Sequence, residues 1–357
     1  MLLGTATACD KKKKDGVYMP EKGKVEIFQL MPENASLMMS YVIKTPNNKI
    51  VVFDGGRDGD GLDKDPYIIS AIRAILGIGE TDEFEIEAWF LTHEHRDHYY
   101  ELAKCLNQYT EYSGYKINNF YFDFPEIGPE GEWDSRTGAG DYTPVQLNRL
   151  KKGFDKYYKA LGEKAPDGAG YTYFYDKING AVINTDSVEK GLDIEIDGLN
   201  FKILRTWSKK DLVVNSTSVI TRITYGEHSM LVLGDSYVDS GDEILKKYGA
   251  DALKSEYVQL AHHGQAGCSE AFYKAIDIEN TIRLWPTPWW VWDVKGREHL
   301  VTNKTRSWAG LPEDSDEVTT IGTTDFVGGS YEKYPEEPTA VASWTRDVLN
   351  GMKVAVW

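Results

Sequence analysis

The chain has 357 residues, of which 41% are hydrophobic, and this suffices for two modest domains or one elaborated α/β domain. Its 40 Lys and Arg against 56 Asp and Glu give a net charge of -16, which disfavours general polynucleotide binding because it opposes attraction to phosphates. No apolar run reaches the roughly 18 to 20 residues that cross a bilayer, and no segment repeats with the period of a solenoid. The three cysteines match no zinc-finger spacing and cannot all pair with one another, so we expect no disulfide framework.

Residues 1–20 contain a short apolar stretch that ends at Cys9, followed by a basic run from Lys11 to Lys14. The apolar stretch is similar to the end of a bacterial lipoprotein signal, in which Cys9 would carry the lipid. This signal remnant would make the protein a lipoprotein of the cell envelope or periplasm, with Cys9 as its lipid anchor. The alternative is a disordered N-terminus on a cytoplasmic protein.

The first half of the chain has the pattern of a strand meander followed by a helix and a buried strand. Short apolar or alternating runs, separated by turns rich in Pro, Asn and Gly, predict strands at 25–30, 40–45 and 49–54. Pro66 and Gly77 flank an apolar periodic run and predict a helix over 67–76. The apolar run 84–91 predicts a strand that leads directly into Thr92.

The second half repeats the order of strands and then a helix. A hairpin over 192–206, turning at Asp197-Gly198, opens this half. The patterns that follow predict strands at 218–225 and 229–233, a helix at 240–248 and a strand at 257–261. The stretch between the halves, about 124–190, is rich in Gly, Tyr and charge and is interpreted as an insertion with one helix at 144–161.

The C-terminal stretch 286–357 is unusually aromatic, since seven of the ten tryptophans lie from Trp285 onward. Only a final strand at 352–357 is predicted there. Trp289, Trp290 and Trp292 could form a wall that binds a cation or a sugar through their ring faces. The alternative is hydrophobic filler that packs this extension onto the preceding domain.

Five of the seven histidines lie in two tight groups. The first group, His93-Glu94-His95-Arg96-Asp97-His98, follows the predicted buried strand. Alternate side chains of an extended segment share a face, so His93 and His95 can reach one metal ion, while Asp97 and His98, around the turn, can reach a second. Imidazole and carboxylate ligands without thiolate favour zinc, manganese or iron, with zinc the commonest. The motif therefore predicts two divalent metal ions.

In this motif the chain resembles the metallo-β-lactamase superfamily, whose signature is His-x-His-x-Asp-His after a strand. Three further segments occur in the family's order, namely Val52-Phe53-Asp54-Gly55-Gly56, Leu233-Gly234-Asp235-Ser236 and Leu260-Ala261-His262-His263-Gly264. The resemblance spans about 50–265. It implies an α/β fold, a metallo-β-lactamase-like αββα four-layer sandwich over 21–285 that carries the insertion, with the C-terminal extension packed on the same domain.

The same resemblance implies roles for the remaining site residues. Asp235 would bridge the two ions, Asp54 would orient a ligand, and one or both of His262 and His263 would complete the metal shell. We expect His262 to be the surer ligand, because it continues directly from the predicted strand 257–261. His263, at the start of the turn, would bind the other ion or contact the substrate.

One departure from the family pattern is informative. Many members place another ligand histidine before the bridging Asp, but the only histidine from 99 to 234 is His228, in the expected turn Gly226-Glu227-His228. The chain instead has Asn215, in a segment similar to the subgroup of competence-type hydrolase domains and teichoic-acid phosphorylcholine esterases. Asn215 would lie near the metals as a ligand or substrate contact, or it serves only as a turn residue. Cys105 and Cys268 are interpreted as structural.

The implied reaction is hydrolysis, because two divalent ions that share a water lower its pKa and hold it as hydroxide. Asp97 would orient this nucleophile and carry a proton to the leaving group. The subgroup resemblance and the missing histidine favour a small or short phosphoester or phosphodiester, and we expect no long nucleic acid as partner. A competence-type nuclease and a non-catalytic, metal-containing binding lipoprotein are the alternatives.

Overall fold

The computed structural model describes the greater part of the chain. The described residues are 20–30, 38–56, 62, 66–124, 142–163, 192–208, 210–211, 213–265, 267–288, 320–323, 349 and 352–357. The predictions made for Cys9 and for Trp289, Trp290 and Trp292 fall outside these ranges. Among the helices within them, none combines the length and the hydropathy needed to cross a membrane.

The first sheet has the strand order β14-β1-β2-β3-β4-β5, and β6 also pairs with β4. Its strands are β1 Glu26–Gln29, β2 Ser40–Lys44, β3 Ile50–Asp54, β4 Phe84–Phe90, β5 Tyr115–Ile117, β6 Phe120–Tyr121 and β14 Lys353–Val356. β1, β2 and β3 are antiparallel neighbours, whereas β4 runs parallel to β3, β5 and β6. The C-terminal strand predicted at 352–357 is confirmed as β14, which pairs antiparallel with β1.

The second sheet has the order β13-β12-β11-β10-β9-β8-β7. Its strands are β7 Asp193–Ile196, β8 Leu199–Arg205, β9 Ile220–Tyr225, β10 His228–Val232, β11 Tyr257–Gln259, β12 Ile282–Pro288 and β13 Thr320–Thr323. The hairpin predicted at Asp197-Gly198 joins β7 to β8. From β10 to β13 all neighbours are parallel, so their carboxyl ends lie at one edge of the sheet.

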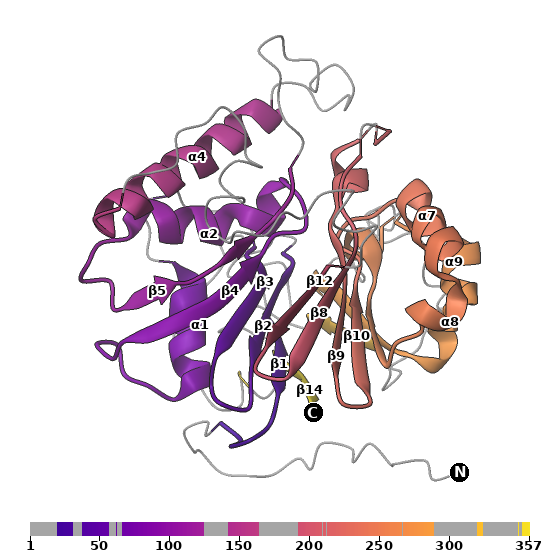
Figure 1. Cartoon of the computed structure of the whole chain (residues 1–357), viewed down its shortest axis with the longest axis horizontal. Coiled ribbons are helices and arrows are strands. Elements are labelled where there is room, and N and C mark those ends of the chain that lie inside the picture. Colours follow the sequence, from indigo (N-terminus) through magenta and orange to yellow (C-terminus); the bar gives the residue numbers. More distant parts are fainter. Residues whose placement is uncertain are drawn as a thin grey trace, which may run out of the picture.

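Helices cover the outer face of each sheet, as Figure 1 shows. On the first sheet they are α1 Tyr67–Leu76, α2 Arg96–Gln108 and α4 Tyr142–Ala160, and on the second α7 Val238–Tyr248, α8 Ala250–Leu253 and α9 Glu270–Ala275. Three short 3-10 turns, η1 Val214–Thr217, η2 Ala261–Gly264 and η3 Ile278–Asn280, connect elements of the second half. The predicted αββα four-layer sandwich is therefore confirmed.

The two sheets meet through aromatic side chains of their inner faces. Phe53 of β3 and Phe90 of β4 stack with ring centroids 4.6 Å apart, and Phe201 of β8 stacks on Phe90 at 5.2 Å. All three rings are buried. Offset stacking of this kind adds about 0.5–1.5 kcal/mol per pair beyond the burial of apolar area, so this contact helps to fix one sheet against the other.

The helix ends follow from the residues that flank them. Pro66 precedes α1 with φ -65, and Gly77 ends it in the left-handed region with φ 67. The Gly77 N–H donates to the Ala74 carbonyl and the Ile78 N–H donates to the Arg73 carbonyl, which caps the last turn. The predicted bounds of α1 are thus confirmed. The described part of the proposed insertion is α4, whose Gly153 lets the helix approach Leu106 of α2 closely.

One predicted strand is shorter than expected. The strand predicted over 257–261 ends at Gln259, because residues 261–264 turn sharply into η2. His262 and His263 therefore both lie in that turn, and neither is held by strand pairing. The preference for His262 as the surer ligand assumed that strand pairing fixes its position, and the turn removes that reason.

Candidate metal centre

The His-x-His-x-Asp-His motif lies where β4 passes into α2. β4 ends at Phe90, Thr92 and His93 follow, and His95 is the extended residue before the first turn of α2. Asp97 and His98 lie inside that first turn. The ring centroid of His93 is 4.8 Å from that of His95 and 4.1 Å from that of His98, so the turn gathers three imidazoles.

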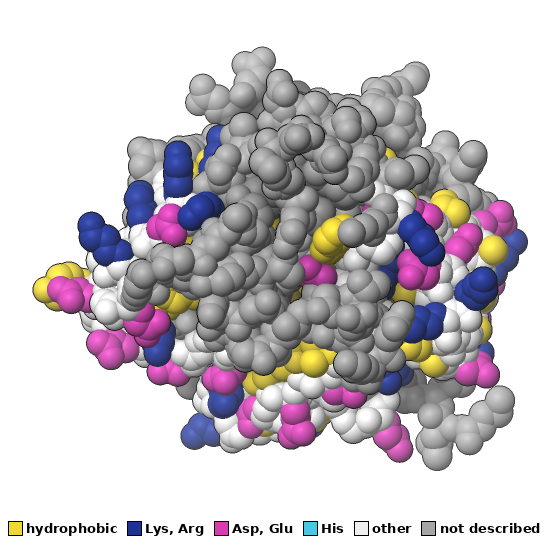
Figure 2. Space-filling view, turned by 45° about the horizontal axis from the view of Figure 1, so that its top comes forward, with side chains coloured by type: hydrophobic (Ala, Val, Ile, Leu, Met, Phe, Trp, Pro, Cys, Tyr) yellow, Lys and Arg dark blue, Asp and Glu magenta, His cyan; other side chains and the backbone are white. Residues whose placement is uncertain are grey.

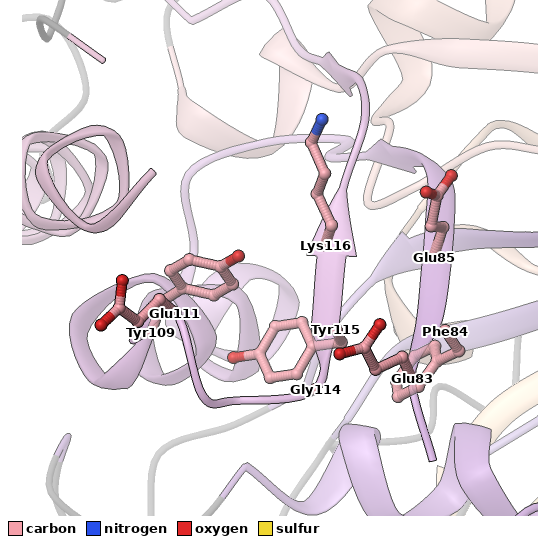
Figure 3. A pocket seen from close by; sticks show the side chains of 8 residues that line it. All are labelled: Glu83, Phe84, Glu85, Tyr109, Glu111, Gly114, Tyr115 and Lys116. Atoms are coloured by element: carbon pink, nitrogen blue, oxygen red, sulfur yellow. The ribbon is translucent and has the colours of Figure 1, made fainter. Parts of the chain in front are cut away.

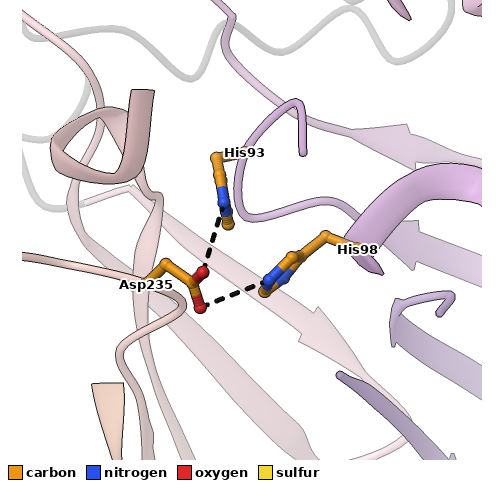
Figure 4. Close-up of side chains that lie close together, drawn as sticks. All are labelled: His93, His98 and Asp235. Carbon is orange, nitrogen blue, oxygen red and sulfur yellow. Dashed lines mark ion pairs between the residues drawn. The ribbon is translucent and has the colours of Figure 1, made fainter. Parts of the chain in front are cut away.

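Asp235 comes to the same place from the second sheet. It follows β10, and its N–H donates to Ser218 Oγ at 3.0 Å. Its Oδ2 lies 3.6 Å from His93 Nε2, and its Oδ1 lies 3.2 Å from His98 Nε2 (Figure 4). Asp235 therefore stands between ligand atoms of the first half of the chain, as a bridging carboxylate would.

The described residues contain two groups whose ligand atoms lie within 4.8 Å of one another. One group is His93, His98 and Asp235, and the other is Asp97, His98 and His263. His93 Nε2, His98 Nε2 and Asp235 Oδ1 are buried without a hydrogen bond. Buried polar atoms rarely lack partners, and three that converge on one point would each be satisfied by a cation. The residues present thus fit the metal that the resemblance implies.

Electrostatics at the centre also favour a cation. Burial lowers the pKa of His93 and of His95, which keeps both imidazoles in the neutral form that binds metals. Burial acts to raise the pKa of Asp235, but the surrounding histidines, His98 first, hold it well below its usual range. Burial would lower the pKa of His98, yet the Asp235 and Asp54 carboxylates raise it well above its usual value. The cluster therefore stabilises a positive charge between its carboxylates.

Asp54 lies at the end of β3 and fixes the orientation of His98. Its Oδ2 accepts a hydrogen bond from His98 Nδ1 at 2.7 Å and one from Thr92 Oγ1 at 2.8 Å, and its Oδ1 accepts one from the Thr92 N–H at 2.7 Å. The proton of His98 is thereby held on Nδ1, so that Nε2 faces Asp235. Such carboxylate partners orient ligating histidines and raise their basicity.

His263 is oriented by residues of β12, the strand that pairs with β11. Its Nδ1 donates to the Pro286 carbonyl at 2.8 Å, and its Nε2 lies 3.3 Å from Asp97 Oδ2 and 3.8 Å from Asp235 Oδ1. Trp285 Nε1 donates to the His263 carbonyl at 2.7 Å. The sequence pattern did not reveal these roles of Trp285 and Pro286, because only the parallel pairing of β11 and β12 brings them beside η2.

Gly264 gives a testable consequence of this packing. Its φ is +73, and an added Cβ would overlap the indole of Trp285. We expect Gly264→Ala to displace His263 and weaken metal binding, measured by metal content, with a fall in melting temperature. Gly226→Ala is the control, because Gly226 is also left-handed, at φ +58, but has open space around it. Its substitution therefore measures only the free-energy cost of placing a side chain on left-handed backbone, about 1–2 kcal/mol. Equal effects of the two changes would contradict this role of Gly264.

His262 has a different environment from His263. Its Nε2 accepts a hydrogen bond from Asn215 Nδ2 at 3.2 Å and lies 4.0 Å from Asp235 Oδ2. It belongs to neither ligand group found among the described residues, and the same holds for His95. Asn215, which the sequence left open as ligand, substrate contact or turn residue, lies in η1 and reaches the centre through His262.

Other candidates lie away from the centre. His228 begins β10, whereas Asp235 follows the end of that strand, and His228 Nδ1 bonds Glu256 Oε2 at 2.7 Å. Cys105 and Cys268 are buried and free, as the structural interpretation requires. A hollow of about 360 Å³ with acidic and aromatic side chains, Glu83, Tyr109, Glu111 and Tyr115 among them, lies at the start of β4, at the opposite end of that strand from His93 (Figure 3).

The chain is similar to known proteins over a short segment in sequence and over most of its length in structure. No protein-family model matches the chain. It is 31% identical over 87 residues to the competence protein ComA of Neisseria gonorrhoeae, a match that covers 24% of this chain and only 12% of that protein. Among solved structures it is similar to the metallo-β-lactamase fold protein YhfI of Bacillus subtilis, with 12% identity, 81% of this chain and 95% of that chain covered, and a TM-score of 0.39.

A diphosphatase of the PhnP family is a further similar structure, with 11% identity, 73% of this chain and 85% of that chain covered, and a TM-score of 0.39. The order of strands, the outer helices and the His-x-His-x-Asp-His motif together define a metallo-β-lactamase fold for this chain. Its His and Asp groups can bind metal.

Proposed function

We propose that this protein is a metal-dependent hydrolase that holds two divalent ions, with zinc the commonest for such ligands, and acts on a small phosphoester or phosphodiester. The observation that carries the proposal is the convergence of ligand atoms from both halves of the chain: His93, His98 and Asp235 form one group, and Asp97 and His263 lie beside it, close to His98. When bound, the ions supply Lewis acidity and a hydroxide nucleophile at neutral pH.

The chain's own residues provide orientation and charge. Asp54 accepts the Nδ1 proton of His98, and the Pro286 carbonyl accepts the Nδ1 proton of His263. In both histidines Nε2 then points toward the centre. We propose that Asp97, whose Oδ2 lies 3.3 Å from His263 Nε2, accepts a proton from the nucleophile and passes it to the leaving group. Asp97 is partly exposed, which would give substrate access to it.

The phosphoester assignment rests on three observations. His228 does not reach the centre, so the ligand histidine common in other branches of the family is missing. Asn215 lies beside His262 instead. In addition, the net charge of -16 opposes attraction to a long polyanion, which supports a small rather than a polymeric substrate. Figure 2 shows acidic side chains among the basic ones on the described surface of that face.

Hydrolysis assays test the proposal. After loading with Zn²⁺ or Mn²⁺, the protein should hydrolyse bis(p-nitrophenyl) phosphate or p-nitrophenyl-phosphorylcholine, and plasmid DNA should remain intact. The Asp97→Asn variant should be far less active on the same esters. Turnover of a β-lactam or thioester without any turnover of the phosphoesters would contradict the substrate class.

A competence-type nuclease is the second candidate, and the ComA match is the observation that favours it. Cleavage of plasmid DNA at a rate that rises with polynucleotide length would favour the nuclease over the hydrolase of small phosphoesters. Stoichiometric metal without turnover of any of these substrates would instead favour the non-catalytic binding lipoprotein.

A further inference from the structure

We propose that the two adjacent histidines have separate roles: His263 holds metal, whereas His262 and Asn215 form a hydrogen-bonded pair that contacts the phosphoryl group of the substrate. The identity of that group rests on the proposed function, but the division between ligand and non-ligand does not. The inference reverses the expectation from sequence that His262 is the surer ligand.

The first argument is the use of the ring nitrogens. A histidine binds metal through a free lone pair, and His263 directs its Nε2 toward Asp97 and Asp235 because Nδ1 donates to Pro286. The Nε2 lone pair of His262 is already engaged by the Asn215 amide. The proton of His262 is then on Nδ1, a buried donor that has no hydrogen-bond partner among the described residues.

The second argument is backbone conformation. His262 and His263 both have φ 52, with ψ of 48 and 27, so two successive non-glycine residues adopt the left-handed region. Each such residue costs about 1–2 kcal/mol, and strain of this kind persists at functional sites. Two hydrogen bonds hold the turn, from the His262 N–H to the Gly234 carbonyl at 3.1 Å and from the Gln265 N–H to the His262 carbonyl at 2.7 Å. The turn aims neighbouring side chains at different partners.

The third argument is the rigid support of Asn215. The carbonyl of the next residue, Ser216, accepts hydrogen bonds from Arg205 and from Ser240 Oγ. Ser216 Oγ donates to Asp239 Oδ1 at 2.9 Å, and Thr217 Oγ1 donates to the Val214 carbonyl at 2.7 Å. A turn fixed by so many side chains holds Asn215 in one position.

Asn215 itself has an unused polar atom. The side chain is buried, and its Oδ1 has no hydrogen-bond partner in the described part of the chain. The His262 ring, 20% exposed as a side chain, is closer to solvent than that of His263 at 1%. The pair thus leaves one buried donor, His262 Nδ1–H, and one buried acceptor, Asn215 Oδ1, without a partner among the described residues, and the same His262 ring brings its Nε2 to 4.0 Å from Asp235 Oδ2. A phosphoryl oxygen accepts from the first, and a hydroxyl or water donates to the second.

The test compares the same substitution at both histidines. Asparagine tolerates the left-handed region, so His262→Asn and His263→Asn add little backbone strain. His263→Asn should lose at least one equivalent of metal. His262→Asn and Asn215→Ala should keep the wild-type metal content and the wild-type response to a competing chelator. His228→Asn, at the distant hairpin, is the control.

Substrate contact is measured separately, with inorganic phosphate as the probe. Titration calorimetry of the metal-loaded proteins should show about tenfold weaker phosphate binding for His262→Asn, the loss of roughly one charge-assisted hydrogen bond. Its kcat/KM for bis(p-nitrophenyl) phosphate should fall by about 10²-fold, as when one preorganised donor is removed. The double variant with Asn215→Ala should lose less than the product of the two single effects, because the residues act as a pair.

Loss of metal from His262→Asn would overturn the proposal, and so would unchanged phosphate binding in that variant. If the wild-type protein hydrolyses no phosphoester, the proposed function fails, but the metal and phosphate measurements still decide between ligand and non-ligand.

Discussion

Replacement of Asp235 by alanine is expected to remove metal and to abolish hydrolysis. Asp235 is the carboxylate that approaches His93, His98 and His263 together, at 3.6, 3.2 and 3.8 Å. Without it, Asp97 and Asp54 are the carboxylates that remain beside the buried imidazoles, so less negative charge balances a bound divalent ion. Because metal-based charge stabilisation contributes several kcal/mol to such reactions, kcat/KM should fall by about 10³-fold or more.

The measurements are metal content by elemental analysis and steady-state hydrolysis of bis(p-nitrophenyl) phosphate. Asp251→Ala is the matched control, because that side chain in α8 is 95% exposed and, among the described residues, pairs with Lys254, the residue after the helix. Full metal content in Asp235→Ala would refute the bridging role. Metal binding by the wild-type protein and by Asp251→Ala should also weaken as pH falls, since protons compete for the imidazoles.

Asp54→Asn is the second change with a large expected effect. The two Asp54 oxygens accept three hydrogen bonds, from His98 and from the N–H and hydroxyl of Thr92. An amide keeps the shape of the side chain but turns one acceptor into a donor, which then faces another donor. Loss of such an orienting partner typically lowers metal affinity or activity by about 10–100-fold, and we expect a decrease in that range.

A backbone-matched control exists for this change. Asp54 has φ 55, and Asp197 in the surface hairpin has φ 53. Asp197→Asn therefore tests the same substitution in the same conformation, away from the centre. Chelator competition should separate the two variants clearly, and equal metal affinities would show that Asp54 serves stability alone.

The sequence predicted the fold well where hydrophobic period and turn residues agreed. The helix at 67–76 has its predicted bounds because Pro66 and Gly77 fix both ends. The residues Asp197 and Gly198 likewise located the hairpin of β7 and β8. In both places the signal is local, so a single segment contains all the information needed.

The site was predicted less completely, because some of its determinants are not local. The spacing of His93, His95, Asp97 and His98 could be read directly, but nothing near His263 indicates that the Pro286 carbonyl orients it. The strand predicted through Ala261 also hid the left-handed turn, since φ depends on contacts with Gly234 and Trp285 that lie far along the chain. Strand propensity therefore gave the wrong backbone conformation for His262, which lies in η2 and not in a strand.

The centre draws its ligand groups from both halves of the sandwich, with His93 and His98 on the first and Asp235 and His263 on the second. An ion bound there is a cross-link between two sheets that otherwise meet through apolar contacts such as Phe90 on Phe201. Its binding free energy then adds to the free energy of folding, by RT ln(1 + [M]/Kd). The melting temperature should rise with free metal concentration, so a shortage of metal in the cell would lower the stability of this protein.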